Sequence, residues 1–347
     1  MKKITLVLAF VAIALIVSSC GAGTKVTYSP EESFLNLVKI TDEANGAVIG
    51  NGTNFNLQSL GDYNKNTVGY SKSSRYFWNT SRLLAVSPDG EEIAFLSRDA
   101  TGVGAKNVFS KEDNIRIRKV FGAGTSTQRT FRNINSLSWG VDDNLYFADE
   151  SNSTVNPYIG SVNAHTGNII RQHTNNNTDS NPTLSPDGST LFFTRKDNIG
   201  PFIWALDLNK GTLTSCARGF NQYPVSNYEF YCVRNSASGR SEIWYINFQT
   251  GQETLILTDP KISFSNPSVS PDGTWIAVQG NGADKNKKQS LDIYAVKTDG
   301  TNFTRLTYLN STDCNPVWGK DGKSIFFISS RGNKGDWFNV WKMNFTL

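Results

Sequence analysis

The stretch Ser185-Pro186-Asp187-Gly188 decides the fold, because the same tetrapeptide recurs at Ser87–Gly90 and Ser270–Gly273, with a degraded copy at Gly319–Gly322. Proline presets φ at the second turn position, aspartate can accept a backbone hydrogen bond, and glycine tolerates the left-handed conformation. Each copy is followed by a short apolar run. The tetrapeptide therefore predicts the tight turn of a β-hairpin.

A second turn follows each copy, at residues 207–211, 247–251 and 297–300, and a strand-like run precedes each of these turns. The repeating unit is thus strand, tight turn, strand, longer loop, strand, tight turn, strand. That order is typical of a four-stranded antiparallel blade. Self-similarity at this period indicates a propeller or another repeat array.

The number of blades follows from the turn anchors, which stand at positions 87, 138, 185, 226, 270 and 319. Their spacings are 51, 47, 41, 44 and 49 residues, which gives six units. A seventh unit would have to lie within residues 34–80, where we find no turn anchor. We therefore predict an all-β fold, a six-bladed β-propeller of four-stranded antiparallel blades.

The last repeat ends soon after its third strand, at residues 339–343, with no fourth strand behind it. Two stretches near the N-terminus, residues 35–40 and 53–60, have the character of strands, and the second resembles the fourth strand at 300–307. An N-terminal strand that completes the last blade would leave no sheet edge exposed. We expect the ring to be closed in this way, and deletion of residues 34–60 to destabilise it.

The repeat resembles that of the TolB-like β-propeller family, a WD-like propeller repeat, over residues 80–347. The family's recurrent arginine after the second strand matches Arg98, Arg195, Arg234 and Arg331. Its proline ahead of the first strand matches Pro182, Pro224, Pro267 and Pro316.

TolB itself carries an α/β domain ahead of its propeller. Here only about 60 residues separate the expected signal cleavage site from Arg82, and they show no convincing helical pattern. The resemblance therefore implies a TolB-like propeller without the TolB N-terminal domain, and a role in the Tol–Pal system is not carried over.

The N-terminus resembles a bacterial lipoprotein signal. A basic start precedes a 14-residue apolar run, which is too short to span a bilayer. It ends in Val17-Ser18-Ser19-Cys20-Gly21, which resembles a lipobox. We expect residues 1–19 to be the signal peptide, Cys20 to be lipidated, residues 20–33 to be a tether and residues 34–347 to be the propeller. The alternative is an ordinary secretory signal with a chance cysteine.

These features predict a cell-envelope protein that meets the membrane through its lipid anchor only. Gly21 is not the acidic residue that in some bacteria retains a lipoprotein at the inner membrane, which favours the outer membrane. The periplasmic and surface-facing orientations both stay open. We expect a monomer. Removing the signal takes Lys2 and Lys3 from the 34 basic residues, and the 32 that remain face 30 acidic ones. A net charge of +2 is no footprint for nucleic acid.

Three further cysteines, Cys216, Cys232 and Cys314, allow two interpretations. An exported protein can form disulfides, and Cys216–Cys232 would be the pair. Alternatively all three are small buried hydrophobic residues. None has metal-ligand spacing.

Strand direction puts the longer loops and the blade connectors on one face of the ring, which we call the loop face. Loops on a rigid scaffold are where binding residues concentrate. Trp204, Trp244 and Trp341 share one repeat position, so we assign them to packing between blades. The candidate partner contacts are a tryptophan and basic residues of the loop face: Trp337, Lys334, Arg331, Lys285, Lys287, Lys288, Arg195 and Lys196.

Catalytic and metal-binding patterns are lacking. The chain has two histidines, His165 and His173, too few for the histidine-rich metal centre of the propeller-type pectic lyases that the repeat also resembles. The turn aspartates Asp89, Asp187 and Asp272 lie about a blade apart, so spacing does not bring them together. No nucleophile elbow or phosphate loop is present. We predict no catalytic residue, no metal and no cofactor.

Two functions fit these observations. The first is a non-catalytic envelope lipoprotein whose loop face binds a protein or glycan. The second is a propeller enzyme that acts on polysaccharide or peptide, with carboxylates at the mouth of the central channel. A scaffold that is recognised only through its blade surfaces is a third possibility.

Overall fold

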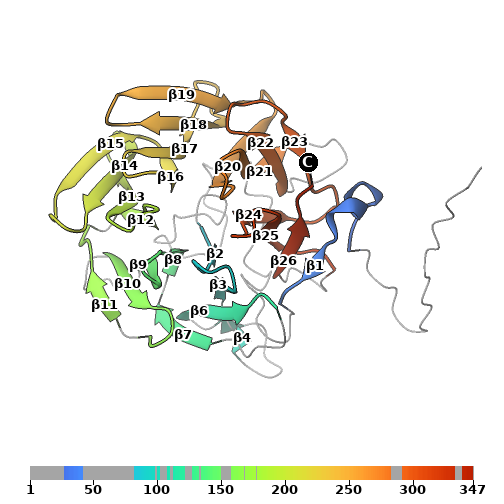
Figure 1. The fold of residues 1–347 in the computed structure, drawn as a ribbon, viewed down its shortest axis with the longest axis horizontal. Helices are drawn as coiled ribbons and strands as arrows, with labels where there is room; N and C mark the ends of the chain where they lie inside the picture. The colour runs from blue at the N-terminus through green and yellow to red at the C-terminus, as the bar shows by residue number, and fades with distance from the viewer. Residues whose placement is uncertain are drawn as a thin grey trace, which may run out of the picture.

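The structure, a computed structural model, describes residues 27–41, 82–97, 100–101, 108–109, 112–121, 127–132, 134–149, 158–167, 169–176, 178–282, 291–332 and 338–346. Within these ranges the chain forms six four-stranded antiparallel sheets arranged as blades around a central axis (Figure 1). The predicted six-bladed propeller is confirmed, and the described ranges hold no seventh blade.

The blades follow one another along the chain, each with its first strand innermost (Figure 1). Blade 1 consists of β2 (Leu84–Val86), β3 (Glu92–Ser97), β6 (Glu112–Lys119) and β7 (Thr127–Arg132). Blade 2 consists of β8 (Ile134–Trp139), β9 (Asn144–Asp149), β10 (Tyr158–Asn163) and β11 (Ile169–Gln172). Blade 3 consists of β12 (Asp179–Leu184), β13 (Thr190–Asp197), β14 (Gly200–Asp207) and β15 (Leu213–Arg218).

The second half of the ring repeats this order. Blade 4 consists of β16 (Phe220–Pro224), β17 (Glu229–Asn235), β18 (Ser241–Asn247) and β19 (Gln252–Leu257). Blade 5 consists of β20 (Ile262–Val269), β21 (Trp275–Gly282), β22 (Leu291–Lys297) and β23 (Thr304–Arg305). Blade 6 consists of β24 (Asp313–Trp318), β25 (Ser324–Ser329), β26 (Asn339–Asn344) and β1 (Val38–Lys39). The short strands β4 (Ala100–Thr101) and β5 (Val108–Phe109) form a separate two-stranded sheet.

The Ser-Pro-Asp-Gly turns join the first and second strands of blades 1, 3 and 5. In blade 3, Gly188 has φ +79°, and its N–H donates to the Ser185 carbonyl at 2.9 Å. The buried Ser185 hydroxyl donates to Asp187 Oδ1 at 2.7 Å and accepts the Thr190 N–H at 3.0 Å. The serine therefore joins the turn to the second strand. The sequence predicted roles in the turn for the proline, the aspartate and the glycine, and not for the serine.

Each first strand of blades 3 to 6 contains one asparagine with positive φ. These residues are Asn181, Asn221, Asn266 and Asn315, with φ between 50° and 55°. The strand register shifts at each of them, so they form β-bulges. Asparagine tolerates this backbone conformation better than other side chains with a Cβ. Proline follows directly in three of the four cases, at 182, 267 and 316.

The N-terminal strand closes the ring, as predicted. Strand β1 pairs antiparallel with β26, so that Val38 faces Lys342 and Lys39 faces Trp341. Of the two stretches named from the sequence, the one at residues 35–40 supplies this strand, and the one at 53–60 lies outside the described residues. The preceding 3-10 helix η1 (Pro30–Leu35) packs on the same blade. Its Leu35 is fully buried in a hydrophobic cluster with Trp318, Phe327 and Trp341, which we call the Trp341 cluster.

Candidate functional site

The structure describes three of the nine residues named from the sequence as functional: Arg195, Lys196 and Arg331. The other six lie outside the described residues, namely Cys20, Lys285, Lys287, Lys288, Lys334 and Trp337. The signal peptide, the first part of the expected tether and the recurrent Arg98 also lie outside.

The recurrent arginine and the recurrent tryptophan belong to one structural unit. In blade 3 the guanidinium carbon of Arg195 lies 4.9 Å from the centroid of the Trp204 ring. Arg195 Nε and Nη2 donate to the two carboxylate oxygens of Asp179 at 2.7 and 2.9 Å. A planar guanidinium can stack on a ring and still form two parallel hydrogen bonds. Arg195 therefore joins strands β12, β13 and β14, and 18% of its side chain is exposed.

Blade 4 has the same stacking with a different carboxylate. Arg234 lies 5.1 Å from the Trp244 ring centroid, and both of its terminal nitrogens donate to Glu253 at 2.7 Å. Glu253 stands on the outermost strand, and 47% of its side chain is exposed. The ion pair raises the pKa of Arg234 and lowers that of Glu253.

Arg331 occupies this position in blade 6 and is fully buried there. Its Nη2 donates to Asp313 Oδ2 at 2.6 Å, and its Nη1 donates to Glu32 Oε2 at 3.2 Å. Both carboxylate side chains are also fully buried. The Arg331 side chain thus joins the N-terminal segment to the last blade. It is not available to contact a partner directly, contrary to the surface role expected from the sequence.

Both carboxylate oxygens of Glu32 accept backbone hydrogen bonds that hold the N-terminal segment in place. Its Oε1 accepts the backbone N–H groups of Tyr308 and Leu309 at 2.5 and 3.1 Å, and its Oε2 accepts the Ser29 N–H at 2.9 Å. Thr41 donates to Asn339 Oδ1 at 2.8 Å at the other end of the segment. Residues 27–41 thus form a closing latch on blade 6, and we use this name for them below.

Lys196 lies near the end of β13 on the loop face, two residues before the β13–β14 turn at residues 198–199. Lys196 is exposed, and Ile199 is 67% exposed at the tip of the turn. The exposed Arg218 of β15 donates through Nη2 to the Ile199 carbonyl at 3.5 Å, and its guanidinium carbon lies 5.6 Å from the Phe202 ring centroid. We call Lys196, Ile199, Phe202 and Arg218 the Ile199 patch. In the sequence, the isoleucine at position 199 between Asn198 and Gly200 was the signal from which this patch could have been predicted.

The central axis is occupied by protein groups. The innermost strands of neighbouring blades contact one another around the ring, and Asn221 Nδ2 donates to Asn266 Oδ1 at 2.6 Å. Arg82 of blade 1 reaches to blade 5, where its Nη2 donates to the Pro267 carbonyl at 3.1 Å. Burial lowers the pKa of Arg82 to about 10. The axis therefore holds a cation fixed by backbone carbonyls.

Both histidines lie in blade 2 and have structural partners. His165 Nε2 lies 2.9 Å from Asp143 Oδ2. His173 Nε2 lies 2.9 Å from the buried Ser161 hydroxyl, and burial is the main cause that lowers the pKa of His173 to about 4. The imidazole of His173 is therefore neutral near pH 7. Among the described residues there is no group of three or more histidine, cysteine or acidic side chains that could hold a metal ion.

The turn aspartates likewise belong to their own turns. Hydrogen bonds from Ser189, Asn227 and Ser185 lower the pKa of Asp187, and those from Ser270 and Thr274 lower the pKa of Asp272. The three cysteines Cys216, Cys232 and Cys314 are free thiols, and the last two are fully buried. The predicted Cys216–Cys232 disulfide is absent from the structure, and the alternative of buried hydrophobic residues holds for Cys232 and Cys314, whereas Cys216 is half-buried.

The described part of the chain contains no helix that is long and apolar enough to cross a membrane.

Solved structures with a similar fold include TolB proteins. TolB from Acinetobacter baumannii shares 15% identity, with a TM-score of 0.54 over 74% of this chain and 64% of that one. A protein described as TolB from Agrobacterium tumefaciens shares 16% identity, with a TM-score of 0.53 over 77% of this chain and 90% of that one.

A weaker similarity connects the chain with an oligogalacturonate lyase in complex with manganese, at 16% identity and a TM-score of 0.42, over 55% of this chain and 57% of that one. No protein-family model matches the sequence. The chain spans less than two thirds of the length of the Acinetobacter protein. At these identities the similarity establishes the fold alone: the chain is a six-bladed β-propeller whose fold is similar to that of TolB proteins.

Proposed function

We propose that this protein is a non-catalytic lipoprotein of the cell envelope, anchored through Cys20, whose loop face binds a partner protein through the Ile199 patch. The observation that carries this proposal is the exposure of Ile199. A 67% exposed aliphatic side chain at the tip of a hairpin, beside Lys196, Arg218 and the carboxylate of Asp197, combines an apolar anchor with a polar rim of net positive charge. Buried apolar anchors with a polar rim are typical of protein interfaces.

The hairpin itself is well suited to present such an anchor. Strands β13 and β14 pair without a register shift from Thr190–Asp207 to Asp197–Gly200. The Asp197 side chain accepts the Ile199 N–H at 2.9 Å, and the Arg218 side chain holds the Ile199 carbonyl. A preorganised loop loses little conformational entropy on binding. The net positive charge of this rim favours a partner with acidic residues around an apolar pocket.

The charged groups of the described blades support a binding role over a catalytic one. Asp179 and Asp313 are bound by the arginines of their own blades, and His173 is bound to Ser161. A catalytic carboxylate or imidazole has to be within reach of its substrate. These groups instead stabilise the blades.

Site-specific photo-crosslinking in intact cells tests the partner contact. A photoreactive amino acid at position 199 should give a discrete adduct, whereas the same residue at position 209, an exposed turn position on the opposite face, should give none. Charge reversal by Lys196→Glu and Arg218→Glu should remove the adduct at 199. Equal adducts at 199 and 209, or an adduct that survives charge reversal, would rule out this patch. A captured glycan in place of a protein would reject the protein partner.

The lipid anchor is tested separately. Labelled palmitate should be incorporated into the wild-type chain and not into a Cys20→Ala variant, and the variant should leave the membrane fraction. Incorporation that persists in the variant would refute the assignment of Cys20.

A further inference from the structure

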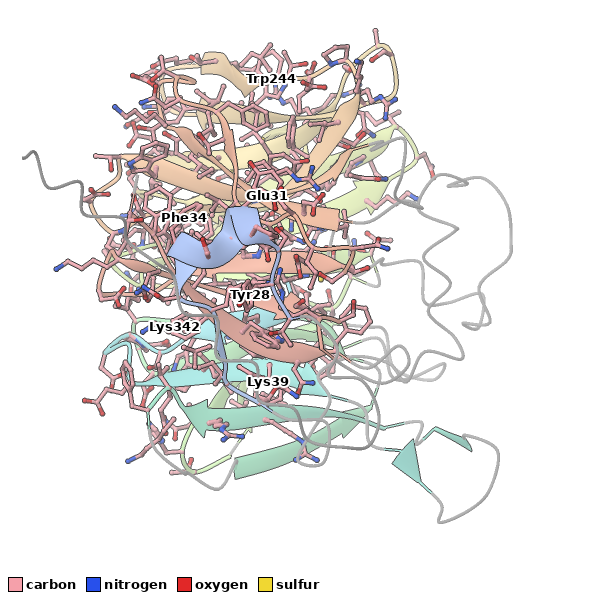
Figure 2. The ribbon with its side chains drawn as sticks, turned by 90° about the vertical axis from the view of Figure 1, so that its right-hand side faces the viewer. Tyr28, Glu31, Phe34, Lys39, Trp244 and Lys342 are labelled. Atoms are coloured by element: carbon pink, nitrogen blue, oxygen red, sulfur yellow. The ribbon has the colours of Figure 1, made fainter. Side chains whose placement is uncertain are left out.

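The outer side of blade 6 carries a concentration of exposed apolar side chains at the start of the described chain. Tyr28 is 54% exposed, Phe34 is 45% exposed and Val38 is 51% exposed, all within eleven residues. Figure 2 shows Tyr28 and Phe34 on the N-terminal segment, where it lies across the front of the last blade. Aromatic side chains exposed in such a group mark an interaction surface more often than isolated ones do.

The apolar surface continues from blade 6 onto blade 1. Val38 pairs with Lys342 across the β1–β26 ladder, so their side chains lie on the same side of the sheet. The Lys342 ammonium lies 4.7 Å from the ring centroid of Phe121, and Phe121 is 72% exposed. We call Tyr28, Phe34, Val38 and Phe121 the rim patch.

The exposure of Phe34 is imposed by the fold. On the inner side of the same segment, Glu32 and Leu35 are fully buried, the first against Arg331 and the second in the Trp341 cluster. These two anchors hold the opposite side of η1, with Phe34, toward solvent. The latch cannot turn Phe34 inward without removing Glu32 or Leu35 from its site.

The expected lipid anchor lies close to this surface along the chain. Cys20 precedes Thr27, the first described residue, by seven positions. A fully extended chain spans at most about 3.3–3.6 Å per residue, so seven residues reach no more than about 25 Å. A lipid on Cys20 would therefore hold the N-terminal end of the latch within about 25 Å of the membrane surface.

We propose that the rim patch docks on the lipid bilayer, so that the propeller lies edge-on at the membrane with blade 6 toward the lipid. This inference rests on the proposed lipid anchor at Cys20. Aromatic side chains are favoured at the membrane–water interface, where an apolar body meets a polar environment. Lys342 beside Phe121 can keep its ammonium among the headgroups while its methylenes cover apolar surface. A second attachment of this kind would also strengthen the hold of the acyl chains.

The edge-on orientation has a consequence for the Ile199 patch. Blade 3, which carries this patch, lies across the ring from blade 6 (Figure 1). A propeller attached by the rim of blade 6 therefore holds the Ile199 patch away from the lipid, where a partner protein can reach it.

Fluorescence quenching by lipids tests the orientation. Full-length lipidated protein is reconstituted into vesicles of phosphatidylethanolamine and phosphatidylglycerol that contain a doxyl-labelled lipid. Single cysteines for a bimane label replace Phe34, Phe121, Leu213 or Leu255 in a Cys216→Ser background. Leu213 and Leu255 are the matched controls, because they are 43% and 42% exposed on the outer strands of blades 3 and 4. We expect quenching at 34 and 121 to be at least about threefold that at 213 and 255, since interfacial aromatic positions lie at the depth of the quencher.

A second set of variants separates docking from simple proximity. Tyr28→Ser together with Phe34→Ser should reduce quenching of the label at 121, whereas Leu213→Ser together with Leu255→Ser should leave it unchanged. Equal quenching at all four positions would overturn the proposal. So would labels at 34 and 121 that are shielded from aqueous iodide yet not quenched by lipid, since this result would indicate a protein or a second copy of the chain on the rim patch.

The failure of the anchor and the failure of docking are distinguishable. If Cys20 is not lipidated, the same labels are read on the full-length Cys20→Ala chain with added vesicles. Selective quenching at 34 and 121 there would support docking without the anchor, and its absence would overturn docking. The palmitate experiment reports on Cys20 independently of both.

Discussion

Blades 3 and 6 contain the same three-part unit in two different environments. In each, an arginine within two residues of the end of the second strand binds an aspartate of the first strand, Arg195 to Asp179 and Arg331 to Asp313. Each arginine also lies near a tryptophan of the third strand. In blade 3 the arginine is 18% exposed, whereas in blade 6 the closing latch covers it and adds a second carboxylate, Glu32.

This difference shows how a repeat position becomes specialised by ring closure. The repeat fixes an arginine beside a carboxylate, and in blade 3 solvent completes its surroundings. In blade 6 the latch replaces that solvent with the Glu32 carboxylate and the Thr27 carbonyl, which both accept hydrogen bonds from Arg331. A buried charge without its partners is strongly destabilising. The blade 6 unit should therefore depend on its partners far more than the blade 3 unit does.

Deletion of the latch, residues 27–41, should have the largest effect. It exposes the edge of β26, removes Leu35 and leaves Arg331 without Glu32. Full burial of a leucine is worth about 2–3 kcal/mol and breaking a buried ion pair costs about 3–5 kcal/mol, so we expect a loss above about 5 kcal/mol in urea unfolding. Phe34→Ser, at an exposed position of the same segment, should stay within about 0.5 kcal/mol of wild type. An unchanged midpoint after the deletion would contradict closure by the latch.

Arg331→Ala should come next, with a loss of about 3–5 kcal/mol, because it leaves two buried carboxylates without a cation. Urea unfolding followed by tryptophan fluorescence would measure it. Adding Glu32→Gln and Asp313→Asn to this variant should restore part of the lost stability, since the amides carry no charge. If the triple variant is no more stable than Arg331→Ala alone, the loss has another cause than unpaired charge.

Arg195→Ala in blade 3 should be milder, with a loss of about 2–3 kcal/mol from the two charge-assisted hydrogen bonds to the buried Asp179. Water can reach the remaining carboxylate through the exposed side of the site. The two losses in free energy of unfolding, measured by urea unfolding in the same buffer, give a quantitative comparison of the arginine units of blades 3 and 6. A loss at Arg195 equal to or larger than that at Arg331 would show that the latch adds nothing to the repeat unit.

Arg234→Ala in blade 4 should be the mildest, at about 1 kcal/mol, because Glu253 is half exposed and ion pairs in such sites contribute little. The stacking on Trp244 accounts for part of this value. Thermal unfolding at low and high salt would separate the two contributions, since only the ion pair is screened. Glu253→Gln serves as the matched control, and a loss as large as that of Arg195→Ala would break the order.

Local sequence patterns were sufficient for the blades. The Ser-Pro-Asp-Gly turn is set by residues within five positions of one another, as the Ser185 contacts with Asp187 and Thr190 show. The recurrence of the arginines was also visible in the sequence, yet the sequence did not indicate which tryptophans and carboxylates they contact. These partners lie on other strands, such as Trp204 for Arg195, and the pairing depends on strand register.

The sequence predicted that an N-terminal strand closes the ring. Only the structure showed that this strand comes from residues 35–40. Strand β1 has two residues, too few for a periodic pattern, and the stretch at 53–60 was also a candidate because it resembles the fourth strand at 300–307. The isoleucine at 199 could be read in the sequence, but its exposure depends on the hairpin that carries it. Arg331 was placed among the surface contacts because its loop could be located and its burial could not.

The amino-acid sequence by itself determined the repeat, the hairpin turns, the six blades and the need for a strand from the N-terminus, because each depends on contacts between near neighbours or on a count of units. The tertiary structure alone decided which of the equivalent arginines is buried, that Glu32 meets Arg331 across 299 positions, and which apolar side chains stay outside. Those outcomes depend on which distant segments exclude water from one another, and no local pattern encodes that.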